Sequence, residues 1–579
     1  MNRILYILLT FSLGLTLSNC GTDTMTETTD PYANLPRPEA DNDGIQLPDN
    51  FGVAVVIDSI GRGRHVAVNN NGDIYLRLRR VRAEDSTGVV ALRDTNADAR
   101  ADLIESFGTG TGTEVALHNG YIYYSSPTQV YRQKMRPGEL TPEPQIDTMI
   151  TFPDSTARGH SSKSFTFDGR GNMYVNIGSR SNACQEEARS KGSPGIDPCP
   201  EDTVRAAIWK FDANQTGQVQ DDGSPYATGI RNTVGLDWNK SNDKLYVMQH
   251  GRDDLYRFWP EHYSDQESRE LPAEEFLMVE EGDDFGWPYC YWDQFKGKKM
   301  LAPEYGGDGE KQGRCEDVKA PLIGFPGHMG PNALLFYTGD LFPTRYKNGA
   351  FIAFHGSWNR INYEQAGFMV AFVPMEDGRP AGEWEIFATG FVGDEPVENP
   401  SNAEFRPCGL AQGSDGSLYV SDSQKGRIWR IMYYGEGSGI SSRPQEIAAQ
   451  ERTGDDDSVE DRLTGQLATG KQVYDTYCRA CHMDNGSGVP GMNPPLAGTE
   501  WVTGDKERLI KVVLNGLNEP IEINGETYQN AMAAHAFLND QQIADVLTYI
   551  RQSFGNNAGA ISANEVAQVR EDTRVSKTD

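Results

Sequence analysis

Short runs of alternating apolar and polar residues fill the middle of the chain, from about residue 51 to residue 435. Alternation with a period of two predicts strands that bury one face, and the Asn, Asp and Gly residues between the runs predict hairpin turns. One phrase recurs at intervals of roughly fifty residues or more, which is typical of propeller blades. It consists of an alternating run, a turn and a strand containing Tyr, at residues 66–76, 115–124, 165–177, 236–248 and 410–421. We therefore expect a six-bladed β-propeller, with a pair of β-sandwiches as the alternative.

The pattern changes after this region. Residues 436–462 carry Gly and Ser and then an acidic run, which predicts a linker. In residues 463–557 the apolar positions follow a helical period, and Gly555 is placed to close the last helix. Residues 558–579 are polar, and we expect a frayed tail there. The predicted fold class is multidomain, with an all-β six-bladed propeller followed by a small all-α domain.

The N-terminus carries an export signal. Arg3 precedes an apolar run at residues 4–17, and Leu17-Ser18-Asn19-Cys20 resembles a bacterial lipoprotein cleavage site that leaves Cys20 acylated. The alternative for residues 1–20 is an ordinary cleaved signal peptide. Residues 21–50 are rich in Thr, Asp and Pro, which predicts a flexible tether. No later stretch is long and apolar enough to span a bilayer. We expect a lipid-anchored protein of the bacterial cell envelope that faces the periplasm or the cell exterior.

The charge balance argues against one class of partner. The 53 Lys and Arg residues against 83 Asp and Glu residues give a formal net charge of -30. A chain of this charge is repelled by the phosphates of nucleic acid, so nucleic-acid binding is not expected. An acidic surface that keeps the protein soluble accounts for the excess.

Export also permits disulfides among the eight cysteines. Cys184 and Cys199 flank one loop rich in Gly, Pro and charge, and Cys290 and Cys315 flank another. We expect each pair to form a local disulfide, although spacing alone does not determine the connectivity. Cys408 is left over and is expected to be a buried free thiol.

The pentapeptide Cys478-Arg479-Ala480-Cys481-His482 offers two thiols that can be tethered to one haem and a histidine that reaches its iron. A zinc or thiol redox site is the alternative, but no second Cys-x-x-Cys pair supplies zinc ligands. With Gly470, Tyr474 and the Pro494-Pro495-Leu496 stretch, residues 463–557 resemble class I cytochromes c.

This resemblance implies haem c, bound covalently at Cys478 and Cys481, with His482 as the proximal iron ligand. It gives the distal position to Met532, whose thioether would raise the reduction potential. His535 is the rival ligand, and bis-histidine ligation would lower the potential. Core packing is the other role open to Met532.

Five segments of residues 51–435 resemble the soluble pyrroloquinoline quinone (PQQ) sugar dehydrogenases, especially the sorbosone and pyranose dehydrogenase-like branch. The order and number of the segments make the resemblance specific. They are Ala227-Thr228-Gly229-Ile230-Arg231-Asn232, His250-Gly251-Arg252-Asp253, Asp284-Phe285-Gly286-Trp287-Pro288-Tyr289-Cys290, Phe354-His355-Gly356-Ser357-Trp358-Asn359-Arg360 and Phe405-Arg406-Pro407.

PQQ is a planar quinone with three carboxylates, and so acidic a protein can hold it only with locally placed cations. Guanidinium groups bind carboxylates in forked pairs. Arg231, Arg360 and Arg406 fall in different blades, and a propeller brings strand ends together at one mouth of its channel. We expect the three arginines to converge on PQQ. The alternative is that each is an ordinary ion-pair residue.

The resemblance also implies a calcium ion that ties PQQ to the protein. The backbone carbonyls of Gly251 and Arg252 would hold this ion, and Asn232 would help to seat the quinone. A second calcium ion is predicted in an EF-hand-like loop at residues 94–105, although Ala99 stands where the EF-hand has Gly. A solvated acidic turn is the alternative for this loop. Its candidate ligands are Asp94, Asn96, Asp98, Asp102 and Glu105.

His160 stands at the position of the family's catalytic histidine. Near neutral pH an imidazole can accept the proton of a sugar hydroxyl while hydride moves to the quinone. A loop histidine bonded to the backbone is the alternative. His250, His328 and His355 lie in family-like segments and are expected to line the same pocket.

The leading hypothesis is an exported quinohaemoprotein dehydrogenase. It would oxidise an aldose or a related sugar or aldehyde at PQQ and pass electrons to haem c and then to an external carrier. That carrier would be a cytochrome, a quinone or an oxidase. The alternative is a carbohydrate-binding or scaffold propeller that carries an electron-transfer cytochrome c without dehydrogenase activity. No Rossmann glycine fingerprint supports a nicotinamide route.

Overall fold

The structure of the chain is a computed structural model. It describes residues 32, 35–80, 87–360, 363–393, 397–436, 438, 466–467, 469–471, 473–474, 477–483, 485–489, 491–517, 519–529, 532, 534–535, 538 and 540–575. The predicted signal segment with Cys20 and most of the predicted linker lie outside the described residues. None of the described helices has the length and apolar character needed to cross a membrane.

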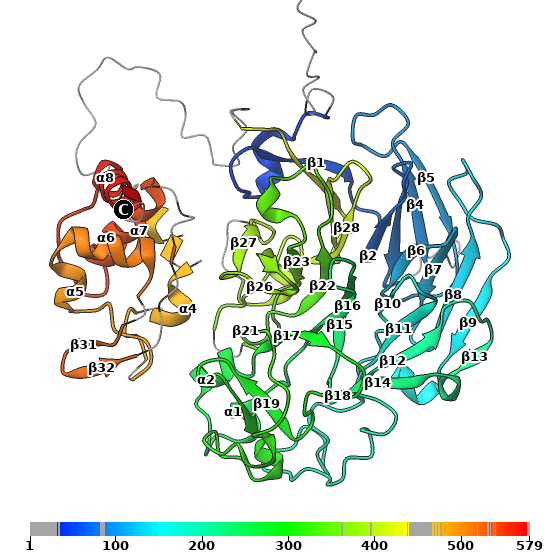
Figure 1. Cartoon of the computed structure of the whole chain (residues 1–579), viewed down its shortest axis with the longest axis horizontal. Coiled ribbons are helices and arrows are strands. Elements are labelled where there is room, and N and C mark those ends of the chain that lie inside the picture. The colour runs from blue at the N-terminus through cyan, green and yellow to red at the C-terminus, as the bar shows by residue number, and fades with distance from the viewer. Residues whose placement is uncertain are drawn as a thin grey trace, which may run out of the picture. The chain divides into compact units, whose positions relative to one another are not determined.

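Six four- or five-stranded sheets form a β-propeller, which confirms the predicted architecture (Figure 1). Blade 1 contains β2 (Gly63–Val68), β3 (Ile74–Leu78), β4 (Val89–Arg93) and β5 (Leu103–Phe107). Blade 2 contains β6 (Val115–His118), β7 (Tyr121–Ser125), β8 (Gln129–Lys134) and β9 (Asp147–Thr151), with β13 (Gln218–Val219) at its edge. Blade 3 contains β10 (Phe165–Phe167), β11 (Asn172–Ile177), β12 (Ala207–Asp212), β14 (Ser224–Thr228) and β18 (Asp283–Asp284).

The remaining blades follow the same order. Blade 4 contains β15 (Thr233–Asn239), β16 (Lys244–Gln249), β17 (Glu274–Val279) and β21 (Ile323–Phe325). Blade 5 contains β22 (Pro331–Phe336), β23 (Ala350–Phe354), β24 (Met369–Val373) and β27 (Glu385–Ala388). Blade 6 contains β28 (Pro407–Gln412), β29 (Leu418–Asp422), β30 (Ile428–Tyr433) and β1 (Phe51–Ile57).

The ring is closed by the first strand of the chain. β1 pairs antiparallel with β30, with Phe51 opposite Tyr433, so blade 6 combines the N- and C-terminal ends of the propeller. The first strands of the blades form the inner wall, where β2 packs against β6 and β28, and β15 packs against β10 and β22. Because every blade starts at this wall, the loops before the first strands and after the second strands meet at one mouth.

Two of the predicted hairpin turns contain a glycine with a positive φ value. Gly72 and Gly416 adopt positive φ values of 90° and 87° between the first and second strands of blades 1 and 6, a conformation in which a side chain is strained. The alternating apolar residues then bury between neighbouring blades. One such cluster joins Tyr246 and Phe276 of blade 4 to Leu334 and Phe354 of blade 5.

The tether prediction is wrong for residues 36–50, which pack on the propeller. This segment contains the 3-10 turn η1 (Ala40–Gly44), and Asn42 accepts a hydrogen bond from Val53 N at 3.0 Å. Ile45 is buried, and Gln46 pairs with Thr389. The polar composition did not predict this docking because polar contacts make much of it, including the ion pair of Asp43 with Arg427.

Both predicted disulfides are present, Cys184–Cys199 and Cys290–Cys315. Cys408 is a buried free cysteine, as expected. The two disulfides tie down loops in the inserted part of blades 3 and 4, which also holds α1 (Leu255–Phe258), α2 (Asp265–Glu270), β19 (Cys290–Asp293) and β20 (Lys298–Leu301).

The C-terminal domain is mainly helical. Its elements are α4 (Arg479–His482), α5 (Glu500–Thr503), α6 (Lys506–Asn515), α7 (Asp540–Gln552) and α8 (Ala563–Val575), with a small hairpin of β31 (Ile521–Ile523) and β32 (Glu526–Tyr528) that the all-α prediction lacks. The prediction of a frayed tail at 558–579 is wrong for α8. Val566 and Val569, three positions apart, bury one helical face in the core of the domain.

Candidate functional site

The loops at one mouth of the propeller carry the residues predicted for the PQQ site. His160 precedes β10, Arg231 and Asn232 precede β15, and Arg406 precedes β28. His250 and His355 directly follow the second strands of blades 4 and 5. These positions are the loops before first strands and after second strands, so residues far apart in the sequence line one opening.

His160 is oriented by Ser179. Its Nδ1 atom lies 2.9 Å from the carbonyl oxygen and 3.0 Å from the hydroxyl oxygen of Ser179. That hydroxyl donates its own hydrogen to the carbonyl of Ser181 at 2.7 Å, so both neighbours of Nδ1 act as acceptors. Nδ1 must therefore carry the ring hydrogen, and Nε2 presents a lone pair. Burial and, after it, the positive charge of Arg231 lower the pKa of His160 to about 3, so the ring is neutral near pH 7.

Arg231 and Asn232 are held in a buried polar network. Arg231 donates to the Asp253 carboxylate at 3.0 Å and to the Asn182 side-chain oxygen at 2.9 Å. Asn232 accepts from the Asn176 amide at 3.1 Å. Burial would raise the pKa of Asp253, but Arg231 and further cations hold it at about 2, so this carboxylate is ionised.

The three predicted arginines have different partners. Arg231 pairs with Asp253, and Arg360 pairs with Glu270 at 2.7 Å. Arg406 instead donates to the carbonyls of His355 at 2.9 Å and Gly356 at 2.6 Å. Two of the three charges are thus already neutralised by a carboxylate, and the convergence of all three on one anion stays a prediction.

Arg64 and Arg79, two cationic residues of blade 1, were not identified from the sequence. Burial, together with Arg64 and Arg79, lowers the pKa of Arg406 to about 10. The pKa of Arg79 is itself lowered, first by Arg64 and then by burial. In the described part of the chain no carboxylate pairs with Arg64 or Arg79, and Arg64 Nε is buried without a partner. Arg64 is half-buried and Arg79 is exposed, so solvent screens part of their repulsion, and an anion bound beside the three arginines would offset the rest.

The β2–β3 hairpin explains why Arg64 and Arg79 lie close together. Arg64 lies on β2 and Arg79 directly after β3, and antiparallel pairing aligns Gly63 with Leu78. The two arginines therefore meet at the mouth end of one hairpin. Finding them required the strand register, which the hydrophobic pattern alone does not supply.

The proposed calcium ligands fit the ion in one respect. The carbonyl oxygens of Gly251 and Arg252 accept no hydrogen bond from any described residue, and Arg252 is buried. The Gly251 N–H donates to Glu274 at 3.0 Å, and burial raises the pKa of Glu274 to about 8. Carbonyl oxygens that accept no hydrogen bond and lie near a carboxyl group suit a hard cation.

The acidic loop of blade 1 is closed by its own hydrogen bonds. Asp94 accepts from the N–H groups of Ala97 and Ala99, both at 2.7 Å, and Thr95 donates to Asp102 at 2.8 Å. Ala99 has a φ of 72°, the left-handed backbone that favours Gly. Asp94, Asn96, Asp98, Asp102 and Glu105 remain predicted calcium ligands.

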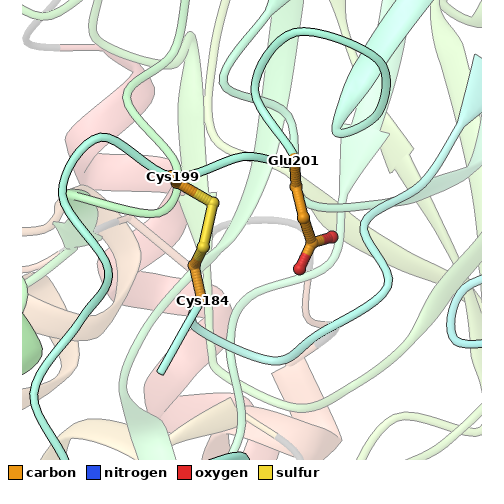
Figure 2. A group of neighbouring side chains, drawn as sticks. All are labelled: Cys184, Cys199 and Glu201. Carbon is orange, nitrogen blue, oxygen red and sulfur yellow. A yellow bond between two sulfur atoms is a disulfide. The ribbon is translucent and has the colours of Figure 1, made fainter. Parts of the chain in front are cut away.

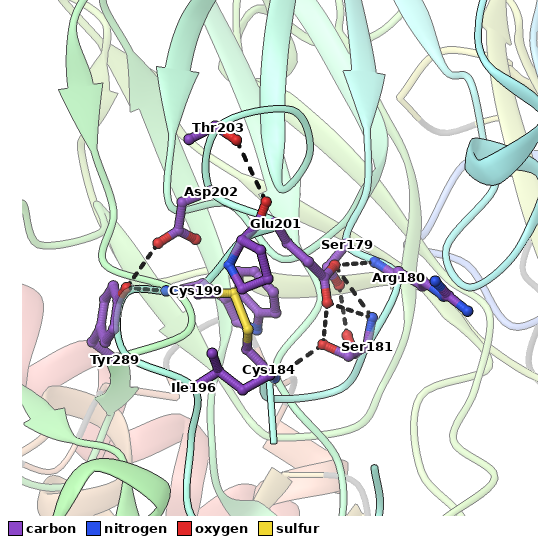
Figure 3. The surroundings of a disulfide bond; sticks show 12 residues. Ser179, Arg180, Ser181, Cys184, Ile196, Cys199, Glu201, Asp202, Thr203 and Tyr289 are labelled. Atoms are coloured by element: carbon purple, nitrogen blue, oxygen red, sulfur yellow. Dashed lines mark hydrogen bonds between the residues drawn. A yellow bond between two sulfur atoms is a disulfide. The ribbon is translucent and has the colours of Figure 1, made fainter. Parts of the chain in front are cut away.

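One group of potential metal ligands is found among the described His, Cys, Asp and Glu side chains, namely Cys184, Cys199 and Glu201 (Figure 2). The two sulfurs form a disulfide, so no thiolate is available for a metal. Glu201 accepts instead from the N–H groups of Arg180 and Ser181. The Tyr289 hydroxyl accepts from Cys199 N at 2.9 Å and donates to Asp202 at 3.0 Å (Figure 3). The disulfide and these hydrogen bonds therefore stabilise the loop between Cys184 and Cys199.

The predicted haem-binding residues are close together in the C-terminal domain. His482 Nδ1 lies 2.9 Å from the carbonyl of Pro494, an acceptor that leaves Nε2 as the atom to bind iron. Burial and the neighbouring His535 lower the pKa of His482. Met532 exchanges both backbone hydrogen bonds with Leu517, and its side chain packs against the domain core. Neither distal candidate, Met532 or His535, is eliminated by these positions.

Comparison with known proteins agrees with this architecture. Residues 45–434 match the family described as TrAA12-like, and residues 467–554 match cytochrome c. A PQQ-dependent sugar dehydrogenase of Hypocrea jecorina is 23% identical over 377 residues, which cover 62% of this chain and 81% of that protein. An uncharacterized protein of Borreliella burgdorferi is 25% identical over half of this chain, and the match spans 65% of its length.

A solved structure has the same fold. The holo form of the pyranose dehydrogenase PQQ domain from Coprinopsis cinerea superposes with a TM-score of 0.53 at 20% identity. The match covers 69% of this chain and 98% of that domain.

Proposed function

Because the chain belongs to the TrAA12-like family and ends in a cytochrome c domain, we propose that it is an exported quinohaemoprotein oxidoreductase. It oxidises an aldose or a related sugar or aldehyde at PQQ, and passes the electrons to haem c and on to an external carrier. The PQQ dependence of the Hypocrea jecorina relative supports the cofactor. The predicted N-terminal signal segment, with Cys20 at its predicted cleavage site, supports export and lipid anchoring in the cell envelope.

The observation that carries the proposal is the fixed tautomer of His160. Its Nδ1 hydrogen is committed to Ser179, and the Nε2 lone pair can take the proton of a substrate hydroxyl. A neutral imidazole is the form that a general base requires. The lowered pKa of His160, about 3, keeps this form dominant across the physiological range.

The residues present also fit an anionic quinone. Arg64, Arg79 and Arg406 form no ion pair with a described carboxylate. Asn232 lies beside His160 across Gly178, close enough that a Cβ on Gly178 would meet both. The open carbonyls of Gly251 and Arg252 would bind the calcium ion. When bound, PQQ supplies the two-electron oxidant. The chain's own part is to hold the carboxylates, exclude water and remove the substrate proton at His160 Nε2.

Electron transfer requires the second domain. Cys478 and Cys481 would carry the thioether bonds of haem c, with His482 and Met532 as iron ligands and His535 as the alternative to Met532. A thioether at iron favours the reduced state, so Met532 ligation suits a haem that accepts electrons.

The test uses the full-length haem-containing protein. PQQ and Ca²⁺ are added with a panel of aldoses and sugar aldehydes, and the haem absorbance and an added dye acceptor are followed together. We expect haem reduction that needs PQQ, Ca²⁺ and a sugar. Failure to take up PQQ under any metal condition would instead favour a carbohydrate-binding or scaffold propeller.

A further inference from the structure

Asp253 is the junction of the buried network at the mouth. One carboxylate oxygen accepts from both Arg231, at 3.0 Å, and Arg189, at 2.7 Å, while the other accepts from the Asn359 amide at 2.9 Å. The backbone of Asp253 is also fixed, because its N–H donates to the Asn182 side chain at 2.8 Å and its carbonyl accepts from it at 3.0 Å. Every polar group of Asp253 thus has a partner from another loop.

Arg189 reaches this junction from the loop that the Cys184–Cys199 disulfide closes. Its second terminal nitrogen donates to Asp254 at 2.9 Å, so one guanidinium bridges two consecutive carboxylates. The side chain of Arg189 is 43% exposed, whereas those of Asp253 and Asp254 are 11% and 2% exposed. Arg189 therefore covers the network from the solvent side.

The backbone of Arg189 has a strained conformation. Arg189 has a φ of 56°, and Asp254, its partner, has a φ of 66°. A residue with a side chain is strained in this left-handed region, where its Cβ approaches the following carbonyl oxygen. Gln185 offsets part of this strain by accepting from Arg189 N at 3.0 Å. Strain of this kind persists where the surroundings enforce it and is concentrated at functional sites.

The four charges of this group balance. Arg189 and Arg231 carry two positive charges, and Asp253 and Asp254 carry two negative ones. Without Arg189 the group would hold a net negative charge beside the position where an anionic cofactor must bind. It would also leave Asp253 with Arg231 as its one remaining cationic partner in the network.

We propose that Arg189 is a positioning residue of the active site. It neutralises the Asp253–Asp254 pair, so that Arg231 keeps its orientation and its positive field toward His160 and toward the carboxylates of the quinone. The role rests on the proposed function, since it concerns the same site. This role would make the Cys184–Cys199 loop, which carries Arg189, part of the active site.

The proposal predicts two effects of Arg189→Gln. Loss of one positive charge leaves the field of Asp253 less opposed at His160, which Arg231, Asp253 and His250 surround, so the pKa of His160 rises by about half a unit to one unit. The affinity for PQQ falls by about threefold to tenfold, because the neighbouring charge changes from neutral to negative. Arg189→Lys restores one point charge without the bridge and recovers part of both effects.

Arg314→Gln is the matched control. Arg314 lies in the Cys290–Cys315 loop and pairs with Asp197 of the Cys184–Cys199 loop. Its side chain is 47% exposed, and no ion pair joins it to Asp253. The measurements are the ring-proton titration of His160 by NMR in the PQQ-free protein, with isotope-labelled histidine, and PQQ binding by fluorescence quenching.

A rise in the His160 pKa and weaker PQQ binding in Arg189→Gln, absent from Arg314→Gln, supports the positioning role. Equal behaviour of the two variants overturns it. If the wild-type protein binds no PQQ, the proposed function fails, and the His160 titration still decides whether Arg189 sets the field at the mouth.

Discussion

At the scale of single residues, His160 gives the sharpest test of the chemistry. Replacing it with Ala removes Nε2 but leaves the arginines and the carbonyls of Gly251 and Arg252 in place. We expect PQQ affinity to change by less than about threefold and turnover to fall by about a hundredfold or more, the usual loss when a general base is removed. Binding titrations and stopped-flow reduction separate the two quantities. Unchanged turnover would exclude His160 as the base.

Lys163 is a buried amine that the proposed reaction does not use. Its Nζ makes one long hydrogen bond, 3.4 Å to the carbonyl of Ser161, and the residue is 1% exposed. Burial and then Arg205 lower the pKa of Lys163 to about 7, against 10.5 in the unfolded chain. Between these values the unfolded state binds more protons, so the native state gains stability as pH rises from 7 to 10.5 and bears the full cost below 7.

Lys163→Met keeps the volume and removes this cost. We expect a stabilisation of at least about 1 kcal/mol at pH 6 that shrinks toward pH 10, measured by urea unfolding. Lys210→Met in the same blade is the control, because Lys210 pairs with Glu281 near the surface and should show no such trend. A gain that does not depend on pH would mean that the pKa of Lys163 is the same in the native and unfolded states, and would contradict the lowered pKa.

The sequence predicted individual site residues only where a motif or a local spacing marked them. His160 and the haem pentapeptide belong to this group. Arg64 and Arg79 do not, because their meeting depends on the β2–β3 register. The ion pairs of Arg231 with Asp253 and of Arg360 with Glu270 were equally hidden, since each joins loops separated by tens of residues.

At the scale of elements, the two disulfides offer a contrast. They close loops with sequence separations of 15 and 25 residues, and loop entropy gives about 3 and about 3.5 kcal/mol of stabilisation. We expect the Cys184→Ser/Cys199→Ser pair to destabilise the propeller slightly less than the Cys290→Ser/Cys315→Ser pair, yet to weaken PQQ binding more, because Asn182 and Arg189 lie in or beside the first loop. Urea unfolding and PQQ titration test both halves, and equal losses of affinity would contradict the argument.

The strands were easier to predict than their packing partners. Alternation and turn residues are local, so blades 1, 2, 3, 4 and 6 could be recognised from the repeated phrase, whereas blade 5 carries no copy of it. The docking of residues 36–50 depends on long-range pairing, such as Gln46 with Thr389, and α8 buries a narrow apolar face within a polar segment. Neither the docked segment nor α8 was predicted, because the overall composition of a segment does not show which few of its residues make long-range contacts.

At the scale of the whole molecule, the proposed function divides one reaction between two domains. The propeller mouth would oxidise the substrate, and the C-terminal domain would carry the covalent haem. Fold similarity at 20% identity supports the propeller but not its substrate, since the loops that set specificity differ most among such relatives. The division of labour can be tested without separating the domains.

The Cys478→Ala/Cys481→Ala variant removes both haem attachment points from the full chain. These residues lie in α4 and the turn before it, far in sequence from every group at the propeller mouth. We expect the variant to lack covalent haem but to keep PQQ binding and sugar oxidation with a small dye acceptor within about twofold, because electrons can leave the quinone directly. Reduction of a protein acceptor should be lost, since transfer through haem is the route to an external carrier. Absorbance of the denatured protein checks haem attachment, and parallel dye and cytochrome assays check the two activities. Loss of dye reduction together with the haem would show that the second domain is needed for sugar oxidation itself and would overturn the proposed order of electron flow.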